Sequence, residues 1–163
     1  MWVGISLGIL LFVIAAVLTV SYVTYRMAFA GKHAVYEPLY GLDRGFFKKH
    51  GDTCRKMIEA MLTVEYEDVR ITSYDGLSLA ARYYRGEDGA PLEIQCHGYK
   101  GHPCRDFSGG ATESLASGRH LLLIHQRAHG ESEGRTISFG VKESLDLLEW
   151  MILVMHISNV YMR

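Results

Sequence analysis

The sequence predicts an α/β domain that follows a single apolar helix. Three features carry this prediction: an uncharged segment at the N-terminus, a strand hairpin that begins near Val64, and an alternation of apolar strands and helices after it. Strands that alternate with helices pair in parallel, because each helix carries the chain back across the sheet. We therefore expect a buried parallel pairing with an antiparallel hairpin at one edge.

The N-terminal segment has the length and composition of a transmembrane helix, predicted over residues 2–25. From Trp2 to Val23 the chain runs for 22 residues without a charge, and at about 1.5 Å per residue this length crosses a hydrocarbon layer of roughly 30 Å. Cleavable signal peptides have shorter apolar segments with a preceding cation, although Ala28-Phe29-Ala30 suits a cleavage site. We predict a retained, single-pass anchor in the lipid bilayer.

The positive charges near this helix predict its orientation. Arg26, Lys32 and Arg44 follow the helix and no Lys or Arg precedes it, so the remainder of the protein is expected in the cytoplasm. Gly4 and Gly8 form a G-x-x-x-G pair, which would allow two such helices to approach closely and the protein to self-associate.

Residues 26–62 mix cations, glycines and aromatic side chains without a sustained period. We interpret them as a juxtamembrane connector, because amphipathic side chains of this kind suit the headgroup region of a membrane. A short helix is predicted over Thr53–Leu62. The domain proper is predicted over residues 63–163.

Composition excludes several functions. The 17 Lys and Arg residues balance 18 Asp and Glu residues, so the chain lacks the basic excess of a nucleic-acid-binding protein. Three cysteines, which are Cys54, Cys96 and Cys104, are too few for a disulfide scaffold. His97 and His102 lie near two of them, but no C-x2-C or H-x3-H spacing is present, so no metal site is expected.

Within the domain, Asp75-Gly76 predicts a hairpin turn between two strands. The second strand alternates, with four apolar side chains on one face: Leu77, Leu79, Ala81 and Tyr83. The apolar segments LEIQC and HLLLIHQ, residues 92–96 and 120–126, predict two buried strands.

Two helices are predicted around these strands. The first covers Asp106–Ser117, with Asp106 as its cap and Gly118 as its end. The second has apolar residues on one face: Val141, Leu145, Leu148, Ile152 and Met155. After it, ISNVYM (157–162) is at most the beginning of another strand.

Both apolar strands end in turns that contain Gly and His, namely HGYKGHP (97–103) and RAHGESEG (127–134). Ligands of open α/β sheets gather at the carboxyl ends of parallel strands. Gly98 frees the backbone to turn, so the N–H of Tyr99 is predicted to point into the crevice, where it would stabilise an oxyanion.

These motifs, with S-F-G-V-K-E after them, resemble α/β-hydrolases of the serine aminopeptidase and monoglyceride-lipase type, particularly bacterial members with an N-terminal membrane helix. The resemblance covers Val64 to Trp150 and implies a serine hydrolase of ester or amide bonds. Small acyl esters or peptides would be its substrates, and it would need no metal or organic cofactor. The turn residues of its oxyanion hole would be His97, Gly98 and Tyr99, and the residues of its active-site loop would be Arg127, His129 and Gly130.

The segment from Gly130 to Gly134 reads G-x-S-x-G, but Ser132 is interpreted as a decoy. The family's nucleophile occupies a strained turn directly between strand and helix, whereas Ser132 lies several residues past the strand in a polar loop. The resemblance implies that nucleophile, acid and histidine follow the second helix. We therefore expect all three beyond Arg163, so that this chain is a truncated and inactive N-terminal half.

The family usually has Asp at the position of His125, where a carboxylate would accept backbone hydrogen bonds and hold the loop. An alternative interpretation of the whole chain is a non-catalytic, membrane-anchored fragment that binds a partner. Its open sheet edge would expose unpaired backbone groups and apolar side chains, which favours association.

Overall fold

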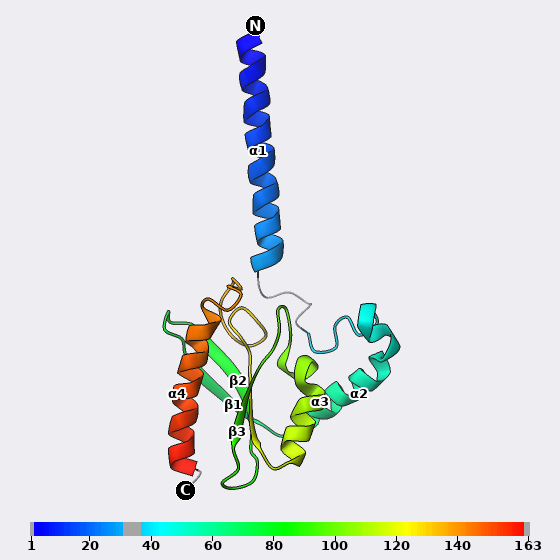
Figure 1. Ribbon diagram of the computed structural model, residues 1–163, viewed down its shortest axis with the longest axis vertical. Helices are drawn as coiled ribbons and strands as arrows, with labels where there is room; N and C mark the ends of the chain where they lie inside the picture. Colours follow the sequence, from blue (N-terminus) through cyan, green and yellow to red (C-terminus); the bar gives the residue numbers. More distant parts are fainter. Residues whose placement is uncertain (1, 31–36, 162–163) are drawn as a thin grey trace. The chain divides into compact units, whose positions relative to one another are not determined.

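The computed structural model describes residues 2–30 and 37–161, without the side chains of residues 2–4, 46–47 and 157–161. Figure 1 shows a long N-terminal helix and a domain with helices on both faces of a small sheet. These two parts are compact units, and each is described by itself.

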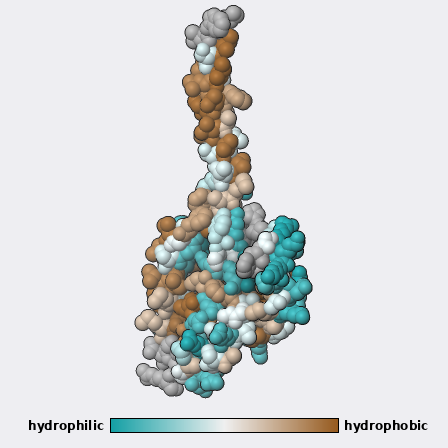
Figure 2. All heavy atoms as spheres, turned by 45° about the vertical axis from the view of Figure 1, so that its right-hand side comes forward, coloured by the Kyte–Doolittle hydropathy of each residue, from teal (hydrophilic) through white to brown (hydrophobic). Residues whose placement is uncertain are grey.

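Helix α1, Trp2–Phe29, is continuous, so the predicted N-terminal helix is confirmed and extends four residues further. Its segment Ile5–Phe29 has a mean hydropathy of 2.4 and no buried residues, which makes it long and apolar enough to cross a membrane. A signal sequence has the same features. Thr19 and Thr24 each donate their hydroxyl to the carbonyl one turn earlier, so these polar groups are satisfied within the helix. Figure 2 shows this helix as a column of hydrophobic side chains.

The predicted connector contains a 3-10 helix, η2, at Gly45–Lys49, and helix α2 at Gly51–Thr63. The short helix predicted in this region is therefore confirmed and begins two residues earlier. Residues 31–36 of the connector lie outside the described residues. Helix α2 buries Ile58 and Met61, because its polar and apolar residues fall on opposite faces.

The sheet has the strand order β1-β2-β4-β3. Strands β1 and β2 form the antiparallel hairpin predicted around Asp75-Gly76, and β4 pairs antiparallel with β2 and parallel with β3. The predicted parallel pairing of the two apolar strands is thus confirmed. The strand bounds are Glu67–Thr72 for β1, Ser78–Tyr84 for β2, Leu92–Cys96 for β3 and His120–Ile124 for β4.

The central strand β4 is buried on both faces, and its alternate side chains fill two cores. Leu121 and Leu123 pack with Met61 of α2 and Ala111 of α3, whereas Leu122 and Ile124 pack on the face that α4 covers. Figure 1 shows α2 and α3 on one side of the sheet and α4 on the other. This alternation follows from the two-residue period of a strand.

Helix α3, Pro103–Ala116, begins three residues before the predicted start, so the prediction of Asp106 as its cap is wrong. The cap is His102, whose Nδ1 accepts from the N–H of Cys104 at 3.2 Å, and Pro103 suits the first helical position because it has no N–H to satisfy. Gly118 has a φ of +78° and ends the helix, as predicted.

Helix α4, Glu143–Tyr161, continues through residues that were predicted to begin a strand, and that prediction is wrong. Its packing face also differs from the predicted apolar stripe. Trp150 is fully buried, and Leu153 and Val154 pack beside it, whereas the stripe is 41–74% exposed over Val141, Leu145, Leu148, Ile152 and Met155. The helix is apolar nearly all round, so periodicity alone does not select its inner face.

Candidate functional site

The carboxyl ends of β3 and β4 bring the two predicted turns together. Cys96, the last residue of β3, pairs with Ile124, the last residue of β4. The turn after β3 closes through a hydrogen bond of 2.9 Å from the N–H of Gly101 to the carbonyl of Gly98. Lys100, its third residue, has a φ of +52°. Tyr99 is therefore the second residue of a four-residue turn.

His97 ties this turn to the loop that follows β4. Its buried imidazole accepts the N–H of Gln126 at Nε2, 3.1 Å away, and its Nδ1 lies 2.9 Å from the carbonyl of Gly98. The first bond requires Nδ1 to carry the proton, so Nδ1 donates to Gly98. The side-chain amide of Gln126 donates in turn to the carbonyl of His97. Burial lowers the pKa of His97 to about 4, so this ring is neutral at neutral pH.

The first turn of α3 holds the same backbone from the other side. Asp106 accepts the N–H of Gly98 at 3.1 Å, and Arg105 donates to the carbonyl of Lys100 at 3.1 Å and to Asp106 at 3.1 Å. A Cβ at Gly101 would collide with the Asp106 carboxylate, so the turn requires glycine there. Sequence reasoning assigned no role to Arg105 and took Asp106 as a helix cap, because the pattern of a helix start does not reveal which loop its polar groups reach.

Tyr99, predicted to supply the oxyanion N–H, has an exposed side chain whose ring stacks on Phe139, with centroids 5.0 Å apart. The Nζ of Lys100 lies 5.2 Å from the same ring. The structure thus places His97, Gly98 and Tyr99 in one fixed turn. The oxyanion role of Tyr99 stays a prediction.

Arg127, predicted in the active-site loop, is a buried structural hub. Its guanidinium donates two hydrogen bonds to Asp146 of α4, at 2.6 and 2.7 Å, and two to Asp75 of the hairpin turn, at 3.0 and 3.1 Å. Hydrogen bonds from Arg127 and Ser73 hold the pKa of Asp75 far below its usual range. All four bonds are charge-assisted, and each carboxylate is bound in the bidentate manner. The guanidinium of Arg127 therefore has a structural role.

Ser132 is fully buried and both functions of its hydroxyl are used. Its Oγ donates to the carbonyl of His125 and accepts the N–H of Ala80 at 2.9 Å. The neighbouring Glu133 exchanges backbone and side-chain bonds with Ser78 of β2. This serine joins the loop to the sheet, which agrees with its interpretation as a loop residue.

The ring of His125 packs directly against Gly130. The ring of His125 is 1% exposed and neither nitrogen has a hydrogen-bond partner among the described residues. A Cβ at Gly130, whose φ is +48°, would overlap this ring. His129, also buried, places Nδ1 2.9 Å from the carbonyl of Arg127.

Four buried imidazoles thus lie under the two turns. The rings of His97 and His129 are 4.6 Å apart, and those of His102 and His125 are 5.4 Å apart. Burial lowers the pKa of His102 to about 3 and that of His125 to about 4. Within the part of the chain that the structure describes, no three His, Cys, Asp or Glu side chains are grouped to hold a metal.

Comparisons with known proteins point to hydrolases. No family model matches the chain. It is 33% identical to the thiohydrolase aneE of Aspergillus aculeatus over 69 residues, which is 42% of this chain and 22% of that protein. It also resembles the solved esterase Pf2001 of Pyrococcus furiosus, with 29% identity and a TM-score of 0.51, over 61% of this chain and 37% of the esterase.

A structure of DcsB in complex with a substrate analogue matches with 20% identity and a TM-score of 0.52, over 60% of this chain and 33% of that one. This likeness concerns the fold alone. The chain spans less than two-fifths of the length of each of these proteins. The fold is therefore hydrolase-like and mixed α/β. The aminopeptidase or monoglyceride-lipase subtype, and the bacterial membrane-anchored type, stay predictions.

Replacing Arg127 with Ala is expected to destabilise the domain by about 3–5 kcal/mol, because Asp146 would remain buried without its cation. Urea denaturation followed by circular dichroism measures this loss. The matched control is Arg135→Ala at an exposed position, for which a change within about 0.5 kcal/mol is expected. Equal losses in the two variants would contradict the role of Arg127 as a hub.

Stability is expected to fall as the pH decreases from about 6.5 to 4.5. Over this range the histidines of the unfolded chain bind protons, whereas His97, His102 and His125 remain largely neutral in the fold because burial lowers the pKa of each. Each contributes a slope of about 1.4 kcal/mol per pH unit. His125→Gln should reduce the measured slope by about one such increment. Urea midpoints at several pH values test this, and an unchanged slope would refute it.

Proposed function

We propose that the domain forms the oxyanion side of a hydrolase that cleaves esters or thioesters, with the N–H of Tyr99 as a donor to the developing oxyanion. The observation that carries the proposal is the fixed turn of residues 98–101 at the carboxyl end of β3, held by His97 and by Asp106. Likeness to an esterase and to a thiohydrolase supports the choice of bond.

The surrounding groups favour stabilisation by the backbone rather than by a charged side chain. Both nitrogens of His97 are used within the protein, and the guanidinium of Arg127 is bonded to two carboxylates. A rigid N–H donor needs no reorganisation when the oxyanion forms, and such a donor contributes about 3–4 kcal/mol to the transition state.

The nucleophile is not assigned to Ser132, whose hydroxyl is buried and bonded on both sides. The proposal assigns no nucleophile, acid or catalytic histidine among the residues that the structure describes. The residues described here supply the oxyanion turn, the strands that carry it and the loop that supports it.

A chimera tests the donor. The esterase of Pyrococcus furiosus would carry residues 92–134 of this chain in place of its matching segment. In that chimera, Tyr99→Pro is expected to lower kcat for a p-nitrophenyl ester by about 100- to 1,000-fold, because proline lacks the N–H. Proline suits the second position of such a turn, so the turn itself should persist.

Tyr99→Ala is the matched control, since it removes the ring but keeps the N–H, and its kcat is expected to remain within a few-fold of the unsubstituted chimera. Equal rates in the proline and alanine variants would contradict the oxyanion role. That result would favour the alternative interpretation of this chain as a non-catalytic, partner-binding protein.

We further propose that α1 anchors the protein in a membrane, as its length and hydropathy support. An Arg near the centre of such a helix costs about 2.5–3.5 kcal/mol on insertion. Val17→Arg should therefore release most of the protein from membranes on extraction with alkaline carbonate, whereas Val17→Leu should not. Release of the unsubstituted protein, or a mature N-terminus beyond Ala30, would oppose a retained anchor.

A further inference from the structure

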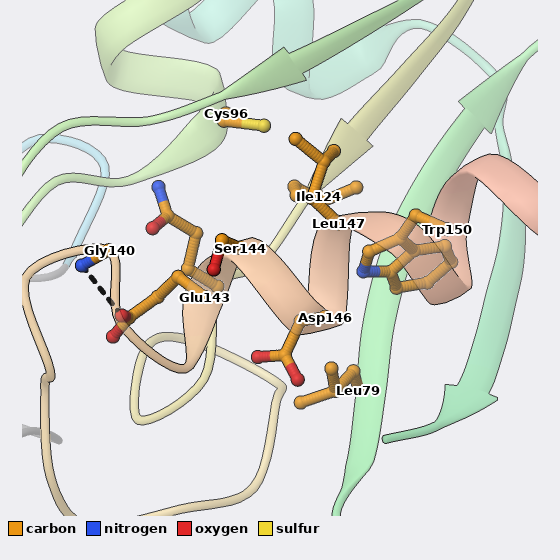
Figure 3. A pocket seen from close by; sticks show the side chains of 10 residues that line it. Leu79, Cys96, Ile124, Gly140, Glu143, Ser144, Asp146, Leu147 and Trp150 are labelled. Atoms are coloured by element: carbon orange, nitrogen blue, oxygen red, sulfur yellow. Dashed lines mark hydrogen bonds between the residues drawn. The ribbon is translucent and has the colours of Figure 1, made fainter. Parts of the chain in front are cut away.

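A cavity of about 190 Å³ lies beside the oxyanion turn, between the sheet and the start of α4. Its wall is built from Leu79 of β2, Ile124 of β4, and Leu147 and Trp150 of α4, and Figure 3 shows these side chains around one space. Cys96 and Ser144 lie at its rim, and both residues are exposed. The space is therefore open to solvent at one end and apolar inside.

The polar groups around this cavity are already bonded within the protein. Glu143 accepts the backbone N–H groups of Ser138 and Gly140, each at 2.8 Å, and Asp146 is paired with Arg127. Figure 3 shows the bond from Gly140. Neither carboxylate needs a cation from a ligand, and both would repel an anion. A ligand of this cavity must therefore be uncharged and bind through its apolar surface.

Volume limits the size of the ligand. An apolar cavity of about 150 Å³ in another protein binds benzene, so 190 Å³ suits a hydrocarbon group of about four to six carbons. A long fatty chain would have to leave most of its length outside. Affinity for a group of this size is expected to be about millimolar, because its buried surface is small.

The cavity is adjacent to the turn in both sequence and space. Cys96 at its rim precedes His97, and Tyr99 follows three residues later. Gln126 also lines the cavity and is bonded to both the imidazole and the carbonyl of His97. We infer that this cavity binds the short, uncharged acyl group of an ester or thioester whose carbonyl oxygen lies at the turn. The inference rests on the proposed function and deepens it by naming the substrate class.

Fluorescence of Trp150 measures the binding directly. The full chain in detergent, with Trp2→Phe so that Trp150 is the only tryptophan, is titrated with methyl pentanoate. A saturable change in emission is expected near about millimolar ester. Pentanoate at about pH 8 should bind at least about tenfold more weakly, because its ionised carboxylate would lose hydration at the edge of an apolar cavity.

Two variants of α4 separate binding in the cavity from partition into detergent. Ser144→Phe places bulk at the rim and should weaken binding about tenfold or more. Leu148→Phe is the matched control, because Leu148 is exposed on the same helix and does not line the cavity, and it should bind as the parent does. Binding that survives Ser144→Phe, or its absence from the parent, overturns the inference.

A second measurement needs no substitution in the cavity. With Cys54→Ser, and with Cys104 buried, iodoacetamide reacts chiefly at Cys96. Saturating methyl pentanoate should slow this alkylation several-fold, and an unchanged rate overturns the inference. Both binding measurements are made without turnover and without any substitution at Tyr99. Failure of the oxyanion role appears only in the esterase chimera, and failure of the acyl site appears only in these measurements.

Discussion

The buried ion pair cluster of Arg127 is the interaction on which the arrangement of this domain depends. It joins Asp75, 52 residues earlier, to Asp146, 19 residues later. A buried guanidinium is costly unless its donors are satisfied, and here four hydrogen bonds satisfy it. Because Asp146 lies in the first turn of α4, the same cluster joins the start of that helix to the hairpin turn and to the loop after β4. Arg127 therefore helps to position α4 and, with it, the cavity between this helix and the sheet.

The loop with the G-x-S-x-G sequence illustrates why a motif needs its structural context. Gly130 is required by the ring of His125, and Gly134, at a φ of +108°, by close contact with the backbone of Ala128. Ser132 between them bonds the loop to β2. Each of these residues thus has a packing reason in this loop, whereas a nucleophile elbow would need the serine at a turn between strand and helix.

Local patterns predicted most of the secondary structure but not the long-range polar contacts. Asp75-Gly76 marks the hairpin because Asp and Gly are favoured in turns and Gly76 takes a φ of +85° there. Two apolar strands with a helix between them favour a parallel pairing. The inner face of α4 was predicted wrongly, since its apolar residues surround the helix and the choice depends on Trp150 and on Asp146, whose partner Arg127 lies in another segment. Asp106 was misassigned for the same reason: its bond to Gly98 crosses from helix to turn.

The charged side chains around the cavity are bonded to other groups of the protein, which limits the ligands that the cavity can bind. The carboxylates of Asp146 and Glu143 and the cation of Arg127 are all bonded within the protein, and the imidazoles below the turns are held neutral by burial. A charged group that entered the cavity would find the carboxylates of Asp146 and Glu143 and the cation of Arg127 already bonded, and it would lose its hydration. In the proposed function, discrimination would come from the fit of an apolar group and from the direction of backbone N–H groups. The fit depends on the side chains of α4 and the sheet that line the cavity. The direction of the N–H groups depends on the turn that His97 and Asp106 hold from opposite sides.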